Sequence, residues 1–392
     1  MRDLGIFVEE TLEEMDPVIS CQETEYGWRG LTQHGEVLEV RSENGHKITI
    51  PTEIIVARRG QAVGKRRVVQ ESTIDIDRYL FYFNAAVDLY KEGRLNEALE
   101  MADMGYRIAE TARGKYNRAF ILLALGRWEE GFSEYWQCEL SKPFLRPLVE
   151  RAFLAGLSPW RGEPITGKRV LLLHSHGFGD TIMNLRYARL LRGAKLVAPL
   201  ELWRIAEQCV EVVLDLADAD YFCPMMHLPY LIGIRSPSQV SDRPYIKASS
   251  VEWKETSRRR VGIGWSVGRP SDGDYPRAVP LEPFVAALGD VEIHSVQVQD
   301  VQEANRLGVI TYQYKDFMDC AQVMMSMDEI VTADTAAVHL AGAIGHPKVT
   351  CLLSHWASWR WLARWYDNVR LLRQPSPGDW DSALREIGHA SS

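Results

Sequence analysis

Asp180 is the residue whose type and position most directly suggest chemistry. It follows the apolar run Val170–Leu173 and a tight turn containing Gly177 and Gly179, and it opens an amphipathic stretch. Strand, glycine turn and helix in this order begin a βαβ unit, where a ligand meets backbone amides and a helix N-terminus. A carboxylate there can take a proton from an acceptor hydroxyl as a general base. The alternative interpretation of Asp180 is a helix N-cap, which contributes about 1 kcal/mol.

A second unit of similar design lies near the other end of the chain. Glu329–Ala333 is a predicted strand, and Asp334 and Thr335 open a helix of small residues. The amides of Thr335 and Ala336, with the positive end of the helix, can bind a diphosphate without a metal ion. His339 either reaches back toward the helix mouth or lies in the core with its hydrogen bonds satisfied. Asp334 is alternatively the cap of a buried helix.

A long polar segment, residues 264–280, follows another predicted strand and carries Ser266, Gly268 and Arg277. Arginine suits phosphate because its planar guanidinium donates two parallel hydrogen bonds. These three residues are therefore candidates for a site that binds an anionic donor. The alternative is a surface loop without a ligand.

Two further groups of residues lie near these candidates. His174 and His176 alternate at the end of a strand and share one face, but no third ligand is within sequence reach, so we expect no metal site. His176 is instead a candidate contact to substrate. The aromatic residues between 356 and 366 favour packing, although a Trp face also suits a sugar or a base.

A basic cluster lies in the N-terminal part of the chain, in the segment ARRGQAVGKRRV. One interpretation is a solvated loop on a small β module, and the other is a contact for an anionic partner such as phosphate or nucleic acid. The cluster consists of Arg58, Arg59, Lys65, Arg66 and Arg67.

The patterning divides the chain into five parts. Residues 1–75 form a small β-rich module, and residues 79–145 form helical repeats in which Gly-Arg-x-x-Glu recurs after 33 residues. Residues 167–250 and 257–375 form two α/β domains, joined to the repeats by a linker that begins at Ser158. Residues 376–392 form a final helix that packs on one of these domains.

Composition excludes several classes of protein. The chain has 392 residues, of which 46% are hydrophobic, and a formal net charge of −8, so it is not built to coat nucleic acid. The first residues are too acidic for a secretory signal, and no apolar run approaches the roughly 20 residues of a membrane span. Six cysteines without CxxC spacing indicate free thiols rather than zinc ligands. We expect a cytoplasmic protein.

The ordered set of motifs resembles the tetratricopeptide-containing glycosyltransferases related to the heptosyltransferase and O-linked N-acetylglucosamine transferase-like families. The matching pieces include GFGDTIMNLRYARLL, VGIGWSVG and DTAAVHLAGAIGHP, and together they span roughly residues 79–382. The resemblance implies an α/β fold of GT-B type. Its two Rossmann-like domains would follow a tetratricopeptide hairpin pair and the N-terminal module.

The resemblance also implies an activity, namely inverting, metal-independent transfer of a hexosyl or related sugar from a nucleotide-sugar donor to an acceptor hydroxyl. Asp180 matches the acid of the family's GxGD motif, and Asp334, Thr335 and His339 match its donor motif. The matching donor-side loop contains Ser266, Gly268 and Arg277. No cofactor or metal is implied, and a homo-oligomer is possible.

Three functions remain open from the sequence. The acceptor is a polypeptide or glycan in the first. In the second it is a hydroxylated base of nucleic acid, as in phage-like DNA modification, which fits the basic N-terminal cluster. The third is a non-catalytic repeat scaffold.

Overall fold

The computed structural model divides the chain into two compact units, Met1–Leu157 and Ser158–Ser392. Each is described below by itself. The structure describes residues 18–389 apart from residues 25–26, 33–36, 42–46, 50–52, 59–60, 68–72, 140–145, 217–218, 237–238, 241–243, 254–255, 267–276, 298–300, 356–357 and 363–364.

The first unit begins with an antiparallel sheet of order β1-β2-β3-β5-β6, and a short pair, β4 and β7, accompanies it. The prediction of a loop for the basic segment is wrong in part. Strand β6 of this segment pairs with β5, and Lys65 lies opposite Ile55. The alternating residues around Lys65 allow a strand. The strands are β1 (Val18–Thr24), β2 (Gly27–Thr32), β3 (Val37–Arg41), β4 (Lys47–Thr49), β5 (Glu53–Arg58), β6 (Gln61–Arg67) and β7 (Thr73–Asp75).

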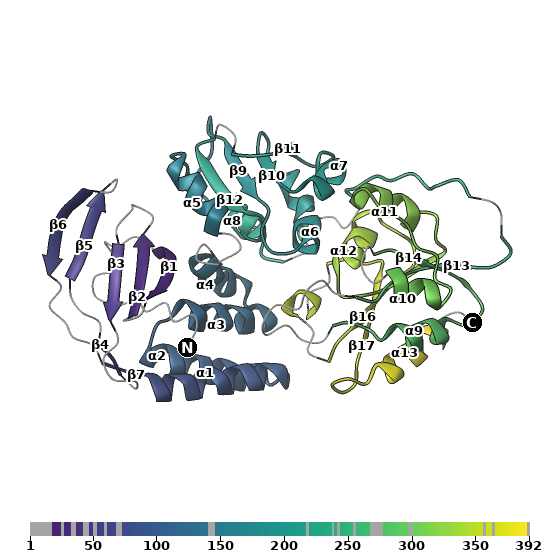
Figure 1. The fold of residues 1–392 in the computed structure, drawn as a ribbon, viewed down its shortest axis with the longest axis horizontal. Helices are drawn as coiled ribbons and strands as arrows, with labels where there is room; N and C mark the ends of the chain where they lie inside the picture. The colour runs from purple at the N-terminus through teal and green to yellow at the C-terminus, as the bar shows by residue number, and fades with distance from the viewer. Residues whose placement is uncertain are drawn as a thin grey trace. The chain divides into compact units, whose positions relative to one another are not determined.

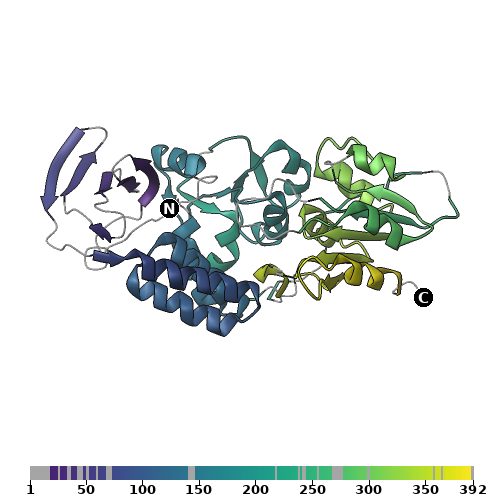
Figure 2. The ribbon, with the colours of Figure 1, turned by 60° about the horizontal axis from the view of Figure 1, so that its bottom comes forward.

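Helices complete the first unit. Helix α1 packs on α2, α2 on α3, and α3 on α4, so the four lie side by side (Figure 1 and Figure 2). The helices are α1 (Ile76–Lys91), α2 (Leu95–Ile108), α3 (Ala112–Ala124), α4 (Trp128–Glu139) and α5 (Arg146–Leu154).

The 33-residue repeat of the sequence reappears in the geometry of two turns. Gly93 and Gly126 have φ of 76° and 75°, in the left-handed region that favours glycine. In each turn the amide of the next residue, Arg94 or Arg127, donates to a carbonyl five residues earlier at 2.9 Å. Each arginine also donates from Nε to the glutamate three residues later at 2.8 Å. The two helical hairpins therefore close with the same contacts.

The second unit contains two parallel five-stranded sheets. The first has the order β11-β10-β9-β12-β8, with β9 at its centre. Ser158 and Pro159, predicted as part of a linker, form the edge strand β8, because Tyr221 and Phe222 of β12 offer it a free edge. The elements are β8 (Ser158–Pro159), β9 (Val170–Leu173), α6 (Phe178–Ala188), β10 (Lys195–Val197), α7 (Trp203–Ala206), β11 (Glu211–Val213), β12 (Tyr221–Pro224) and α8 (Leu228–Leu231).

The second sheet has the order β14-β13-β15-β16-β17, and Ile310 bridges in parallel to His294 of β14. With that bridge as a further strand, its order is that of a Rossmann sheet. The elements are β13 (Arg260–Gly264), α9 (Leu281–Leu288), β14 (Glu292–Ser295), α10 (Val301–Arg306), α11 (Phe317–Met324), β15 (Glu329–Ala333), α12 (Ala336–Ala343), β16 (Val349–Leu353), the 3-10 helix η4 (Trp359–Leu362), β17 (Val369–Arg373) and α13 (Trp380–His389).

The prediction of an α/β fold with two parallel sheets is thus confirmed, and both sheets lie in one compact unit. Apolar strands such as β9 and β15 are buried along their whole length, as expected for sheets covered on both faces. The final helix α13 packs on α9 and β17, and buries Trp380 and Leu384 in the core of the second sheet. Among the helices that the structure describes, none combines the length and apolar character needed to cross a bilayer.

Candidate functional site

The N-termini of α6 and α12 meet, and this contact brings the two acidic motifs together. Helix α6 follows β9 and α12 follows β15, so both begin at the carboxyl ends of central strands. The two helices lie side by side (Figure 1). A Cβ added to Gly179 would lie 2.8 Å from Cδ2 of His339 and 3.2 Å from Cα of Ala336. Only glycine therefore allows this approach. Two positive helix ends at one place form an environment that favours an anion.

Asp180 is the third residue of α6, and Gly177 is its N-cap. The interpretation of Asp180 as the cap is therefore wrong, because its side chain reaches back instead: Oδ2 accepts from the amide of Gly177 at 3.2 Å. The expected turn also differs, since His176 already has φ of 64° and Phe178 begins the helix. A left-handed backbone conformation is uncommon at residues other than glycine. The residues that adopt it cluster at functional sites.

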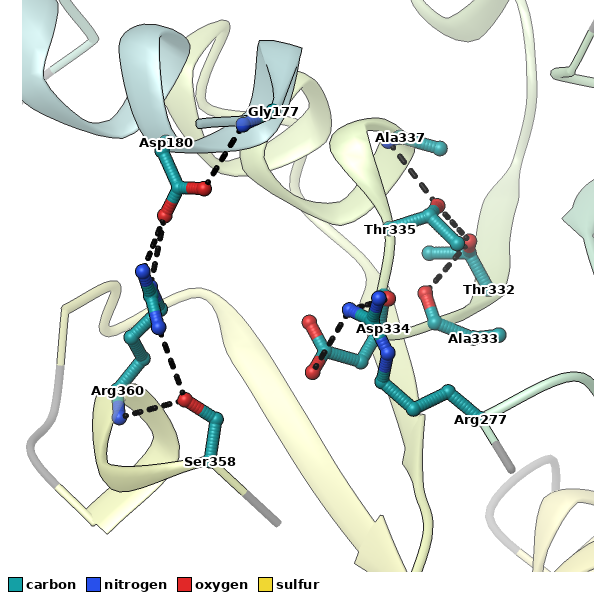
Figure 3. Close-up of polar contacts among 10 residues, drawn as sticks. All are labelled: Gly177, Asp180, Arg277, Thr332, Ala333, Asp334, Thr335, Ala337, Ser358 and Arg360. Carbon is teal, nitrogen blue, oxygen red and sulfur yellow. Dashed lines mark hydrogen bonds and ion pairs between the residues drawn. The ribbon is translucent and has the colours of Figure 1, made fainter. Parts of the chain in front are cut away.

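The other oxygen of Asp180 binds Arg360, as Figure 3 shows. Nε and Nη2 of Arg360 both lie 2.7 Å from Oδ1. The exposed fractions are 17% for the Asp180 side chain and 14% for that of Arg360, so solvent screens this ion pair little. The contact joins residues 180 positions apart and connects the domains of the two sheets.

The charge state of Asp180 follows from these neighbours. Burial raises the pKa of the carboxyl group, but Arg360, His176, His339 and the Gly177 amide together outweigh burial and leave the pKa below its ordinary value. Asp180 is therefore ionised at neutral pH.

Arg360 was missed from the sequence, where it lies within the aromatic segment interpreted as packing. Its guanidinium donates to Oγ of Ser358 at 3.2 Å and lies 4.9 Å from the ring centroid of Trp359. The sequence signal that could have identified Arg360 is its position between two tryptophans, shortly after the apolar strand Val349–Leu353.

Around the N-terminus of α12, Thr335 is the N-cap and Asp334 precedes it, so Asp334 is not the cap. Oγ1 of Thr335 accepts from the amide of Ala337 at 3.2 Å. Arg277 donates from Nη1 to the carbonyl of Asp334 at 3.1 Å and lies 3.7 Å from its carboxylate (Figure 3). A half-buried arginine thus lies beside the N-terminal end of α12.

His339 lies in the core. Its ring stacks on Trp361 at 5.2 Å, and Nδ1 is 3.2 Å from the hydroxyl of Tyr366. Burial lowers the pKa of His339 to about 4, although Asp334 and Asp180 oppose this shift. These contacts agree with the interpretation of His339 as a core histidine. The edge of its ring also packs against Gly179 at the N-terminus of α6.

A buried arginine fixes α6 relative to the second sheet. Arg186 donates to the carbonyl of Trp365 at 2.7 Å, and its guanidinium lies over the rings of Tyr245 and Tyr366 at 5.2 and 4.6 Å. Tyr245 comes from the segment between the two sheets and donates to the carbonyl of Ile182 in α6 at 3.0 Å.

The remaining predicted residues are described only in part. The amide of Ser266 donates to Gln297 at 2.9 Å, Gly268 lies outside the described residues, and half-buried His176 adjoins the mouth of α6. Within the part of the chain that the structure describes, no three His, Cys, Asp or Glu residues group as metal ligands do. Of the basic cluster, Arg59 lies outside the described residues, and only the backbone is described for Arg58, Lys65, Arg66 and Arg67.

The fold and site together define an α/β protein with two parallel five-stranded sheets. The N-termini of helices α6 and α12 meet, and Asp180, Arg277 and Arg360 lie beside them. No family model matches the chain. It is 25% identical over 370 residues to Protein FlbA of Caulobacter vibrioides (strain ATCC 19089 / CIP 103742 / CB 15), a match that covers 79% of this chain and 60% of that relative.

Solved structures similar to this chain include three glycosyltransferases. Escherichia coli heptosyltransferase WaaC with ADP has a TM-score of 0.38 at 13% identity, covering 57% of this chain and 95% of that one. E. coli ADP-heptose lps heptosyltransferase II has a TM-score of 0.40 at 11% identity, covering 57% and 99%. A family 9 glycosyl transferase of Veillonella parvula DSM 2008 has a TM-score of 0.37 at 13% identity, covering 57% of this chain and 88% of that one.

Proposed function

We propose that this chain is a glycosyltransferase of GT-B type that moves a sugar from a nucleotide-sugar donor to an acceptor hydroxyl. The observation that carries the proposal is the meeting of the α6 and α12 N-termini around Asp180, with Arg277 and Arg360 beside them. In open α/β sheets, ligands bind in the crevice at the carboxyl ends of the strands. Both helices start from that edge of their sheets.

The chemistry proposed for Asp180 is general-base catalysis. Its carboxylate removes the proton of the acceptor hydroxyl, and the alkoxide attacks the anomeric carbon opposite the departing diphosphate, which inverts the configuration. The diphosphate binds at the α12 N-terminus and Arg277, where fixed dipoles and a guanidinium oppose the developing negative charge. These groups supply positive charge without a metal ion.

For the acceptor we propose a polypeptide or glycan. The helical hairpins of residues 76–139, closed by repeated glycine turns, support this choice, because stacked tetratricopeptide hairpins form extended binding surfaces. We further propose that the protein acts in the cytoplasm.

A thermal-shift screen with UDP, GDP, ADP, CMP and TDP tests the donor site. Binding to the folded state stabilises it by RT ln(1 + [L]/Kd), or about 2.7 kcal/mol at a concentration of 100 Kd. We expect one nucleotide to raise the unfolding temperature most and Arg277→Gln to reduce that shift. If no nucleotide changes the unfolding temperature, the proposal is wrong.

A further inference from the structure

Both carboxylate oxygens of Asp180 accept hydrogen bonds in this structure. Oδ2 accepts from the Gly177 amide, and Oδ1 accepts from two nitrogens of Arg360. A general base needs a free lone pair directed at the hydroxyl proton. While Arg360 stays on Oδ1, the oxygen that faces away from the helix backbone is occupied by a cation.

Arg360 also lies close to the end of α12. Its partner Asp180 directly follows Gly179, where an added Cβ would lie 3.2 Å from Cα of Ala336, the first residue of α12. The ring of the neighbouring Trp361 stacks on His339. His339 is the fourth residue of α12, and its ring adjoins Gly179. The guanidinium therefore lies near the position proposed for the diphosphate, and a long arginine side chain has the rotatable bonds to change partners.

A diphosphate competes strongly for such a cation. It carries more negative charge than one carboxylate and offers paired oxygens to the planar guanidinium. Two helix N-termini at the same place favour the incoming anion further.

We propose that Arg360 is a shared cation, which pairs with Asp180 in this structure and transfers to the diphosphate when the donor binds. The transfer releases Oδ1 of Asp180 to accept the acceptor's proton, so that donor binding activates the base. Arg360 is thus a positioning residue for Asp180. This inference rests on the proposed function.

The exchange is tested by calorimetric titration with inorganic pyrophosphate and with the nucleoside diphosphate selected by the screen, at fixed ionic strength. Arg360→Gln removes a charge-assisted contact and is expected to weaken binding by about tenfold to a hundredfold. Asp180→Asn removes the competitor of the diphosphate, so binding is expected to tighten by about tenfold. A residue that only stabilises the fold would not give opposite changes in the two variants.

Arg204→Gln is the matched control. Arg204 also connects the domains of the two sheets, through ion pairs with Asp316, the N-cap of α11, and Asp319 in the first turn of that helix. None of the three belongs to the proposed site. The Arg204→Gln protein should bind pyrophosphate as tightly as the wild type does. A urea unfolding curve of each variant verifies that it is folded. Asp180→Asn binding that is unchanged or weaker overturns the shared-cation inference alone. Absence of binding by the wild-type protein overturns the proposed function as well.

Discussion

At the scale of single residues, Asp180 has the clearest chemical prediction. Asp180→Asn keeps the shape of the side chain but removes the charge that accepts a proton. Sugar transfer from the donor identified by the screen should fall by roughly 10² to 10⁴. Product formation measured by mass spectrometry gives the rate, and Asp381→Asn, an exposed acid in the first turn of α13, serves as the control. Full turnover by Asp180→Asn would refute the assignment.

His339 makes stability depend on pH. Burial lowers its pKa from the ordinary 6.5 to about 4, so between these values the unfolded chain binds a proton that the folded protein does not. The free energy of unfolding therefore falls as the pH drops from about 6.5 to about 4, by about 3 kcal/mol at most.

Urea unfolding at pH 7 and pH 5 measures this dependence. His339→Gln should be less stable at pH 7 but lose less stability on acidification than the wild type. His174, whose pKa burial also lowers to about 4, contributes in the same direction and remains in the variant. An identical loss of stability in both proteins would show that His339 is not neutral in the folded state.

At the scale of elements, the contact of α6 with α12 depends on Gly179. Gly179→Ala places a methyl group 2.8 Å from His339 and 3.2 Å from Cα of Ala336, closer than packed carbon atoms approach. We expect a loss of about 1 to 3 kcal/mol in unfolding free energy, larger than alanine's gain in helix propensity, together with weaker nucleotide binding.

Gly177→Ser is the control for that change. A Cβ at Gly177 meets only Oδ2 of Asp180 at 3.7 Å, and serine is a preferred N-cap. Its stability should equal or exceed that of the wild type. Equal stability of the Gly179 and Gly177 variants in chemical unfolding would contradict the close approach of the two helices.

At the scale of the whole molecule, Arg186 joins the two sheets of the second unit. Its guanidinium lies over the rings of Tyr245 and Tyr366 and donates to the carbonyl of Trp365, so Arg186→Ala leaves a cavity and an unsatisfied acceptor. We expect a loss of roughly 2 to 4 kcal/mol and independent opening of the two sheets.

Hydrogen exchange measured by mass spectrometry separates the sheets. In the wild type, the amides of β9 and β15 should open with similar free energies, and in Arg186→Ala they should differ. Arg189→Ala, on an exposed residue at the end of the same helix, should leave both unchanged. A single shared opening energy in Arg186→Ala would exclude this role.

The sequence by itself determined the parts whose signals are local. An apolar run followed by small and acidic residues marks both βαβ units, because burial and helix capping depend on neighbouring residues. The same holds for the turns at Gly93 and Gly126, where only the backbone preference of glycine is needed.

Only the tertiary structure decided which groups meet. The pairing of Arg360 with Asp180 spans 180 positions and depends on how two sheets pack, which periodicity does not encode. The contact of Gly179 with His339 has the same origin. Even the N-caps at Gly177 and Thr335 required the structure, since the nearby Asp180 and Asp334 fit the same local pattern.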